Sequence, residues 1–163
     1  MTEIRIVKNK DDCHTIAQLA NLIWHEHYTP IIGVDQVEYM LAKFQSPEAI
    51  STQIENGYMY YIISHNQNLA GYLSIKKKNT SLFLSKIYVS KDLRGLGIGK
   101  TALNFIEQEA INNRCQSITL TINRHNTHSI KAYEKLGFIK TGTVVQDIGQ
   151  GYVMDDYTME RFL

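Results

Sequence analysis

Three glycines at alternate positions, Gly95, Gly97 and Gly99, lie between a run of β-branched and aromatic residues and a helical pattern. Glycine has no Cβ atom, so another molecule can approach the backbone of such a turn closely. The first N–H groups of the following helix have no partners within the helix and carry a partial positive charge. This combination is suited to binding an anion, and phosphate is the obvious candidate.

The spacing of these residues disfavours two kinds of nucleotide loop. A GxxxxGK[ST] loop would end on Gly99–Thr101 but needs a glycine at the position of Arg94. A GxGxxG/A dinucleotide pattern is nominally met within Gly97–Ala102, yet Thr119–Asn123 fill the place of the acidic ribose-binding residue about 20 positions on. An NAD-dependent oxidoreductase is therefore an alternative that rests on the nominal pattern alone.

A third pattern, [Q/R]xxGx[G/A], is met by Arg94, Gly97 and Gly99. This stretch resembles the acetyl-CoA-binding signature of the GNAT acyltransferase family. About thirty residues downstream, Asn123–Phe138 resembles the family's second segment, the Nxx(S)xxxYxKxGF helix. Two motifs in this order and at this distance identify the chain as a member, with the GNAT fold over nearly its whole length and acetyl-CoA as cosubstrate.

The resemblance also implies roles for individual residues. The main-chain N–H groups of Leu96–Lys100 would bind pyrophosphate, and Ile87 and Val89 would pair with the pantetheine arm. Tyr133 matches the tyrosine that can protonate the departing thiolate, whereas Leu82–Ser85 hold no glutamate for a general base. Coenzyme-binding residues are thus expected at Ile87, Val89, Arg94, Gly95, Leu96, Gly97, Gly99, Lys100 and Asn126.

Two segments are candidates for the amine acceptor site. In the family, the segment after the first helix helps to wall this site, and here that segment is Trp24–Tyr28. The final strand carries adjacent aspartates, and a carboxylate with aromatic rings would suit an alkylammonium group such as that of a polyamine. The alternatives are that Trp24 lies in the core and that the aspartates pair with lysines or cap a turn. Substrate contacts are expected among Glu26, His27, Tyr28, Asp155 and Asp156.

The composition limits the class of protein. The 163 residues are enough for one domain, expected over 1–163. With 20% charged residues and a net charge of +1, no nucleic-acid or membrane partner is indicated, and a small molecule is expected. The spacing of Cys13 and Cys115 suggests neither a disulfide framework nor a metal site. Without an evident targeting segment, a reducing cytoplasm is expected.

The hydrophobic patterns predict the elements that would position these residues. Asp11–Asp12 would cap a helix that ends before Pro30, and Ser46 and Pro47 would begin another. Lys76–Thr80 would form a turn of the strand meander. Strands are expected at Glu3–Val7, Tyr58–Ser64, Leu69–Ile75, Ser81–Val89, Gln116–Ile122, Phe138–Val145 and Tyr152–Phe162. This order corresponds to an α+β, mixed α/β fold, with a mixed, mostly antiparallel sheet of about seven strands flanked by helices.

The sequence therefore predicts an N-acetyltransferase that moves the acetyl group of acetyl-CoA to a primary amine of a small molecule. Two alternatives on the same fold stay open, a non-catalytic acyl-CoA sensor and a protein or peptide N-acetyltransferase. The presence of Tyr133 favours the enzyme over the sensor. A homodimer is left open.

Overall fold

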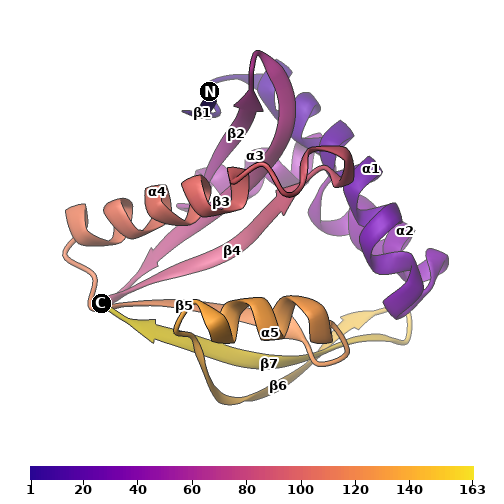
Figure 1. Ribbon diagram of the computed structural model, residues 1–163. Coiled ribbons are helices and arrows are strands. Elements are labelled where there is room, and N and C mark those ends of the chain that lie inside the picture. The colour runs from indigo at the N-terminus through magenta and orange to yellow at the C-terminus, as the bar shows by residue number, and fades with distance from the viewer. The chain divides into compact units, whose positions relative to one another are not determined.

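A seven-stranded mixed sheet with hydrogen-bonded strand order β1-β2-β3-β4-β5-β7-β6 forms the centre of the fold. The computed structural model describes residues 1–163 (Figure 1). The strands are β1 (Thr2–Ile6), β2 (Met59–His65), β3 (Asn68–Lys78), β4 (Ser81–Val89), β5 (Ser117–Asn123), β6 (Ile139–Gly149) and β7 (Tyr152–Phe162). The helices are α1 (Lys10–Ile32), α2 (Val34–Phe44), α3 (Pro47–Glu55), α4 (Ile98–Asn112) and α5 (Thr127–Lys135), with a short 3₁₀ turn at Lys91–Leu93. The fold class expected from the sequence is confirmed.

The chain divides into two compact units, residues 1–76 with 84–108 and residues 77–83 with 109–163. In the first unit, β1 pairs antiparallel with β2, and β2 pairs antiparallel with β3. Helices α1 and α2 lie side by side in this unit (Figure 1). Its core is built of aliphatic residues and two tyrosines that are almost fully buried, among them Ile16, Ile23, Ile50, Tyr60, Ile62, Tyr72, Leu73 and Ile106.

In the second unit, the start of β4 pairs in parallel with β5, from Ser81 opposite Ser117 to Phe83 opposite Thr119. A parallel pair needs a crossover, and α4 is the connecting helix that the sequence predicts. β7 pairs antiparallel with both β5 and β6. The single GNAT domain over residues 1–163 stays a prediction. No helix of the chain is long and apolar enough to cross a lipid bilayer.

Two predictions about helix α1 are wrong. The N-cap is Asn9, whose side-chain oxygen accepts a hydrogen bond of 2.9 Å from the backbone N–H of Asp12. The Asp12 carboxylate instead forms two hydrogen bonds of 2.9 Å with Arg5. Pro30 lies inside the helix, which ends only at Gly33 with φ of 85°. Proline removes a single backbone donor here, and α1 continues for two residues beyond it.

The predicted turn at Lys76–Thr80 is also wrong, because β3 continues through all three lysines to Lys78. The ammonium group of Lys76 lies 4.8 Å from the centre of the Tyr58 ring, so this lysine packs along the sheet. The turn is reduced to Asn79 and Thr80, with Asn79 at φ of 54°. Asparagine adopts this left-handed conformation more readily than most residues. By contrast, the predicted Ser46 cap of α3 is confirmed by a 3.1 Å bond from the backbone N–H of Ala49.

Candidate functional site

The glycine loop leaves β4 through the 3₁₀ turn and enters α4 at Ile98. Gly95 and Gly97 have φ of 82° and 81°, a region where a side chain is strained. A Cβ atom at either of these glycines, or at Gly99, would find no other heavy atom within 4 Å. The loop backbone is therefore open to an approaching ligand, as an anion site at a helix N-terminus requires. The buried Ile98 side chain anchors the start of the helix.

Arg94 ties the loop back to the strand before it. Its Nε–H donates to the carbonyl oxygen of Val89 over 3.2 Å, while the residue itself is exposed. Arg94 is one of the residues expected to bind the coenzyme, and its bond to Val89 spans the five residues between the end of β4 and the glycines. The Nε–H group of Arg94 thus holds the entrance of the loop. The remaining guanidinium N–H groups belong to an exposed side chain.

The backbone of β4 shows which edge of the strand Ile87 and Val89 present. The N–H of Ser90 donates to the carbonyl oxygen of Ala70 in β3 over 2.7 Å, so the backbone of Ser90 points toward β3. Backbone groups of successive residues in a strand point to opposite edges. The N–H and C=O groups of Val89, and of Ile87 two residues earlier, therefore point away from β3, as pairing with an extended arm requires.

The aromatic residues of α1 form a cluster with β3 and β4. Tyr28 and Tyr88 are joined through their hydroxyl groups at 2.8 Å, and the Trp24 ring contacts both rings edge-on at 5.3 Å and 5.8 Å. Trp24 is 4% exposed, and its indole N–H donates to the Tyr72 hydroxyl over 2.9 Å. Trp24 thus lies in the core, whereas Tyr28 is half-buried and its hydroxyl meets β4 at Tyr88.

Of the other α1 candidates, the structure brings His27 to this cluster and separates Glu26 from it. His27 is half-buried and its ring lies 4.7 Å from that of Tyr28. Glu26 is exposed. Because a helix turns about 100° per residue, a residue two positions from Tyr28 projects from nearly the opposite side of α1. The structure therefore places His27 and Tyr28 together and does not place Glu26 with them.

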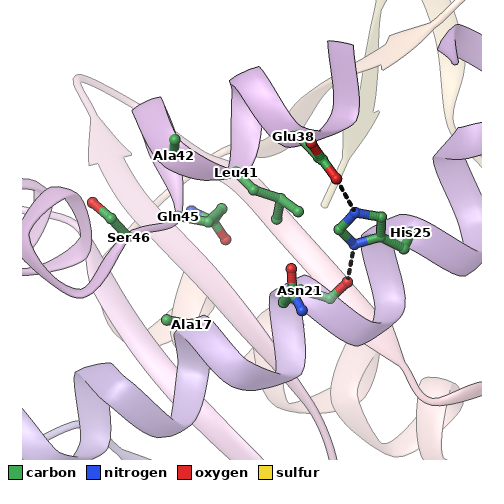
Figure 2. Close-up of a pocket in the computed structure, with 8 residues that line it drawn as sticks. All are labelled: Ala17, Asn21, His25, Glu38, Leu41, Ala42, Gln45 and Ser46. Carbon is green, nitrogen blue, oxygen red and sulfur yellow. Dashed lines mark hydrogen bonds and ion pairs between the residues drawn. The ribbon is translucent and has the colours of Figure 1, made fainter. Parts of the chain in front are cut away.

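A groove of about 330 Å³ lies between α1 and α2 (Figure 2). His25 of α1 reaches Glu38 of α2 with 3.6 Å between Nε2 and Oε1, and its Nδ1 lies 2.7 Å from the carbonyl oxygen of Asn21. The remaining lining residues are Ala17, Leu41, Ala42, Gln45 and Ser46. None of the predicted site residues lines this groove, and no group of three or more His, Cys, Asp or Glu side chains lies together as metal ligands would.

The second motif forms α5, with Asn126 at the N-cap position and Gly137 just beyond its end with φ of 94°. Asn126 is 5% exposed, which is unusual for an asparagine and fits a residue held for a specific contact. Tyr133 is half-buried, and its ring contacts Phe138 edge-on at 5.4 Å. The motif residues Tyr133 and Phe138 therefore pack together locally and fix the direction of the tyrosine side chain.

The adjacent aspartates of β7 have different environments. The Asp155 carboxylate lies 2.9 Å from Nε of Arg124, so it has a cationic partner within the second unit. Asp156 is 5% exposed, and its carboxylate has no such partner. Burial, together with the nearby charge of Asp155, raises the pKa of Asp156 to about 6. An uncompensated carboxylate in this position is costly to the fold.

Sequence analysis missed Lys86, Tyr88 and Gly71. Lys86 is half-buried in β4, one residue before Ile87, and its ammonium group donates to the Ser85 hydroxyl over 3.0 Å. Burial lowers its pKa to about 8. No signal in the sequence marks Lys86 as buried, because lysines in strands are mostly exposed. A glycine inside a strand pattern indicates a bulge or a close approach of another backbone, and Gly71 is such a glycine.

Comparisons with known proteins agree on the family. Residues 16–138 match the model of the acetyltransferase (GNAT) family. A curated relative, the probable spermine N(1)-acetyltransferase of Bacillus subtilis subsp. natto (strain BEST195), is 34% identical over 62 residues. That match covers 37% of this chain and 41% of the relative, so the chain spans about two fifths of the curated relative's length.

Solved structures share the fold. The PaiA N-acetyltransferase of Thermoplasma acidophilum, in complex with coenzyme A, has a TM-score of 0.81 at 21% identity, covering 100% of this chain and 99% of that one. A spermidine N-acetyltransferase chimera of Vibrio cholerae SpeG and hSSAT has a TM-score of 0.68 at 19% identity, covering 99% and 95%. At these identities the likeness is one of fold. The family match over residues 16–138 confirms the resemblance seen in the two motifs: the chain belongs to the acetyltransferase (GNAT) family, whose cosubstrate is acetyl-CoA.

Proposed function

We propose that this protein transfers the acetyl group of acetyl-CoA to a primary amine of a small molecule. The observation that carries the proposal is the open glycine loop, in which Gly95, Gly97 and Gly99 leave the backbone accessible at the N-terminus of α4. Main-chain N–H groups of Leu96–Lys100 bind the pyrophosphate, whose negative charge is favoured by the helix dipole. Arg94 holds the entrance of this loop through Val89.

The strand before the loop holds the pantetheine arm. Main-chain groups of Ile87 and Val89 point to the free side of β4 relative to β3, and pair with the amides of the arm. An N–H group of this edge donates to the thioester carbonyl oxygen, which gains negative charge as the amine attacks. Such a donor lowers the barrier by roughly 3 kcal/mol.

Transfer requires two proton movements. The neutral amine nitrogen bonds to the acetyl carbon, the carbon–sulfur bond breaks, and the amine gives up a proton to water or a nearby base. Tyr133 donates its phenolic proton to the departing thiolate and regains one from solvent. Its contact with Phe138 keeps the hydroxyl direction fixed during this step.

A polyamine is the acceptor that the residues support best. Asp156, buried without a cationic partner, offers the negative charge that an alkylammonium group would compensate. Asp155 already pairs with Arg124, so we assign the acceptor contact to Asp156. His27 and Tyr28 of α1, whose rings lie 4.7 Å apart, stay separate candidates for an acceptor contact. The names of the spermine acetyltransferase relative and of the spermidine acetyltransferase chimera point in the same direction.

Thiol release from acetyl-CoA with a panel of amines tests the proposal. Spermidine and spermine should be acetylated faster than glutamate, which carries carboxylates, and faster than a peptide with a free N-terminus. Thiol reagents suit this assay, because Cys13 and Cys115 are 5% and 8% exposed and react slowly. Binding of acetyl-CoA without release for any amine would instead support the non-catalytic sensor, and preference for the peptide would support a protein N-acetyltransferase.

A further inference from the structure

Gly71 of β3 lies against the peptide between Tyr88 and Val89 of β4. A Cβ atom at Gly71 would lie 1.9 Å from the carbonyl oxygen of Tyr88, 2.9 Å from its carbonyl carbon and 3.0 Å from the Cα of Val89. All three are backbone atoms, so no flexible side chain could move to make room. The carbonyl of Tyr88 therefore occupies the space that any side chain at position 71 would fill.

A β-bulge accompanies this close approach. Ile63 of β2 lies opposite Gly71, but the next residue, Ser64, lies opposite Leu69, so Ala70 is an extra residue in β3. Its carbonyl oxygen accepts the 2.7 Å bond from Ser90. Bulges re-aim the backbone of a strand and are frequent beside active sites. Two consecutive residues of β3 thus fix the end of β4. Ala70 does so by its hydrogen bond with Ser90, and Gly71 does so because it has no side chain.

This arrangement determines where the N–H of Val89 points. In a trans peptide, the carbonyl of one residue and the N–H of the next point in opposite directions. Every peptide bond of the chain is trans, and the Tyr88 carbonyl points onto Gly71. The Val89 N–H therefore points away from β3. Arg94 approaches Val89 at its carbonyl oxygen, which fixes the second polar group of the same residue.

We propose that Gly71 is a positioning residue for acetyl transfer, because its lack of a side chain sets the Tyr88–Val89 peptide so that the Val89 N–H faces the thioester arm of acetyl-CoA. This inference rests on the proposed function and names a residue that does not itself touch the substrate. A methyl group at position 71 would push the peptide by about 1 Å or more, and misplacement on this scale can cost about 10² in rate.

The test is Gly71→Ala, with Gly142→Ala of β6 as the matched control. A Cβ at Gly142 would meet only the Thr158 hydroxyl, at 3.2 Å, and that side chain can move. We expect Gly71→Ala to lower kcat/KM by about 10² and to weaken acetyl-CoA binding. Binding of 3′-phospho-ADP, which has the nucleotide and pyrophosphate of coenzyme A without the pantetheine arm, should change little. Gly142→Ala should match the wild type in all three measurements.

Hydrogen exchange on the wild-type protein tests the inference without any mutation. Acetyl-CoA should slow exchange of the Val89 amide, whereas 3′-phospho-ADP should not, and the Ser90 amide should be slow in the free protein. Wild-type kinetics in folded Gly71→Ala overturn this inference alone. If that variant does not fold, Val89 exchange that is unaffected by acetyl-CoA overturns it. A wild-type protein that transfers no acetyl group overturns the proposed function and this inference together.

Discussion

The Nε–H of Arg94 donates to the carbonyl oxygen of Val89 over 3.2 Å, which joins the first motif residue of the glycine loop to the last residue of β4. The pyrophosphate site and the strand edge that would hold the pantetheine arm are therefore parts of one connected backbone segment.

Position 99 allows the coenzyme site to be tested apart from stability. Gly99 lacks a positive φ and has open space around it, so a side chain there should not strain the fold. Gly99→Val should weaken acetyl-CoA binding by about tenfold or more, because the branched side chain covers backbone that must approach the pyrophosphate. Gly99→Ala, which still satisfies the motif, is the control and should bind nearly normally. Calorimetric titration measures both affinities. If Gly99→Val binds acetyl-CoA as tightly as the wild type does, the pyrophosphate does not bind at this loop.

Tyr133→Phe should lower kcat by about 10² while leaving acetyl-CoA affinity unchanged, because the variant lacks the hydroxyl group that protonates the thiolate. The edge-on contact with Phe138 is kept by a phenylalanine ring, so stability should change little. Tyr61→Phe is the matched control, since Tyr61 is a core tyrosine that packs on Phe105. Full activity of the Tyr133 variant in steady-state assays would return this residue to a purely structural role.

Asp156→Asn should stabilise the protein at neutral pH and lower its activity. Burial raises the pKa of Asp156 from 3.8 to about 6, so the folded state binds its proton more tightly than the unfolded state. Protonated Asp156 therefore stabilises the folded state. This stabilisation is fully present below pH 3.8 and is lost as the pH rises through 6. Relative to the variant, the wild type should therefore lose up to about 3 kcal/mol of unfolding free energy between pH 4 and 7.

Asp155→Asn provides the contrast for that experiment. It removes the partner of Arg124, and because both side chains are about a third exposed, the loss should be only about 0 to 1 kcal/mol. Denaturant unfolding across the pH range measures both variants. The acceptor role of Asp156 predicts a lower kcat/KM for spermidine in its variant and a smaller change for a monoamine. Equal rates of spermidine acetylation by the wild type, Asp155→Asn and Asp156→Asn would show that neither aspartate belongs to the acceptor site.

Lys86→Met should raise stability at pH 7, because the wild-type fold buries part of a positive charge. Burial lowers the pKa of Lys86 from 10.5 to about 8, so the unfolded state binds the extra proton between these values. Wild-type stability should therefore rise with pH from 8 to 10.5 relative to the variant. Chemical unfolding at pH 7 and pH 10 measures the difference. A constant difference at both pH values would show that Lys86 is well solvated.

The sequence predicted the element order and the strands β4 and β7 closely, because hydrophobic periodicity and the two motifs are local signals. The alternation of side chains along β7 predicted that at least one of Asp155 and Asp156 lies on a face with core residues, and Asp156 is the buried one. Which of the two is buried, and the burial of Lys86, could not be predicted, since burial depends on which elements pack over a strand. Gly71 was a recognisable glycine within a strand, but its role depends on contact with Tyr88, seventeen positions away. The helix cap at Asn9 was missed because Asp12, the expected cap, is engaged by Arg5.

The most direct test of the account is mass analysis of the amine after reaction with acetyl-CoA carrying a deuterated acetyl group. With spermidine, the wild-type protein should yield singly acetylated product bearing the label, with one free coenzyme A thiol for each product molecule. The Tyr133→Phe variant should yield the same product about 10² times more slowly. Release of coenzyme A without labelled amine, or no release with any amine at saturating acetyl-CoA, would contradict acetyl transfer as the function of this protein.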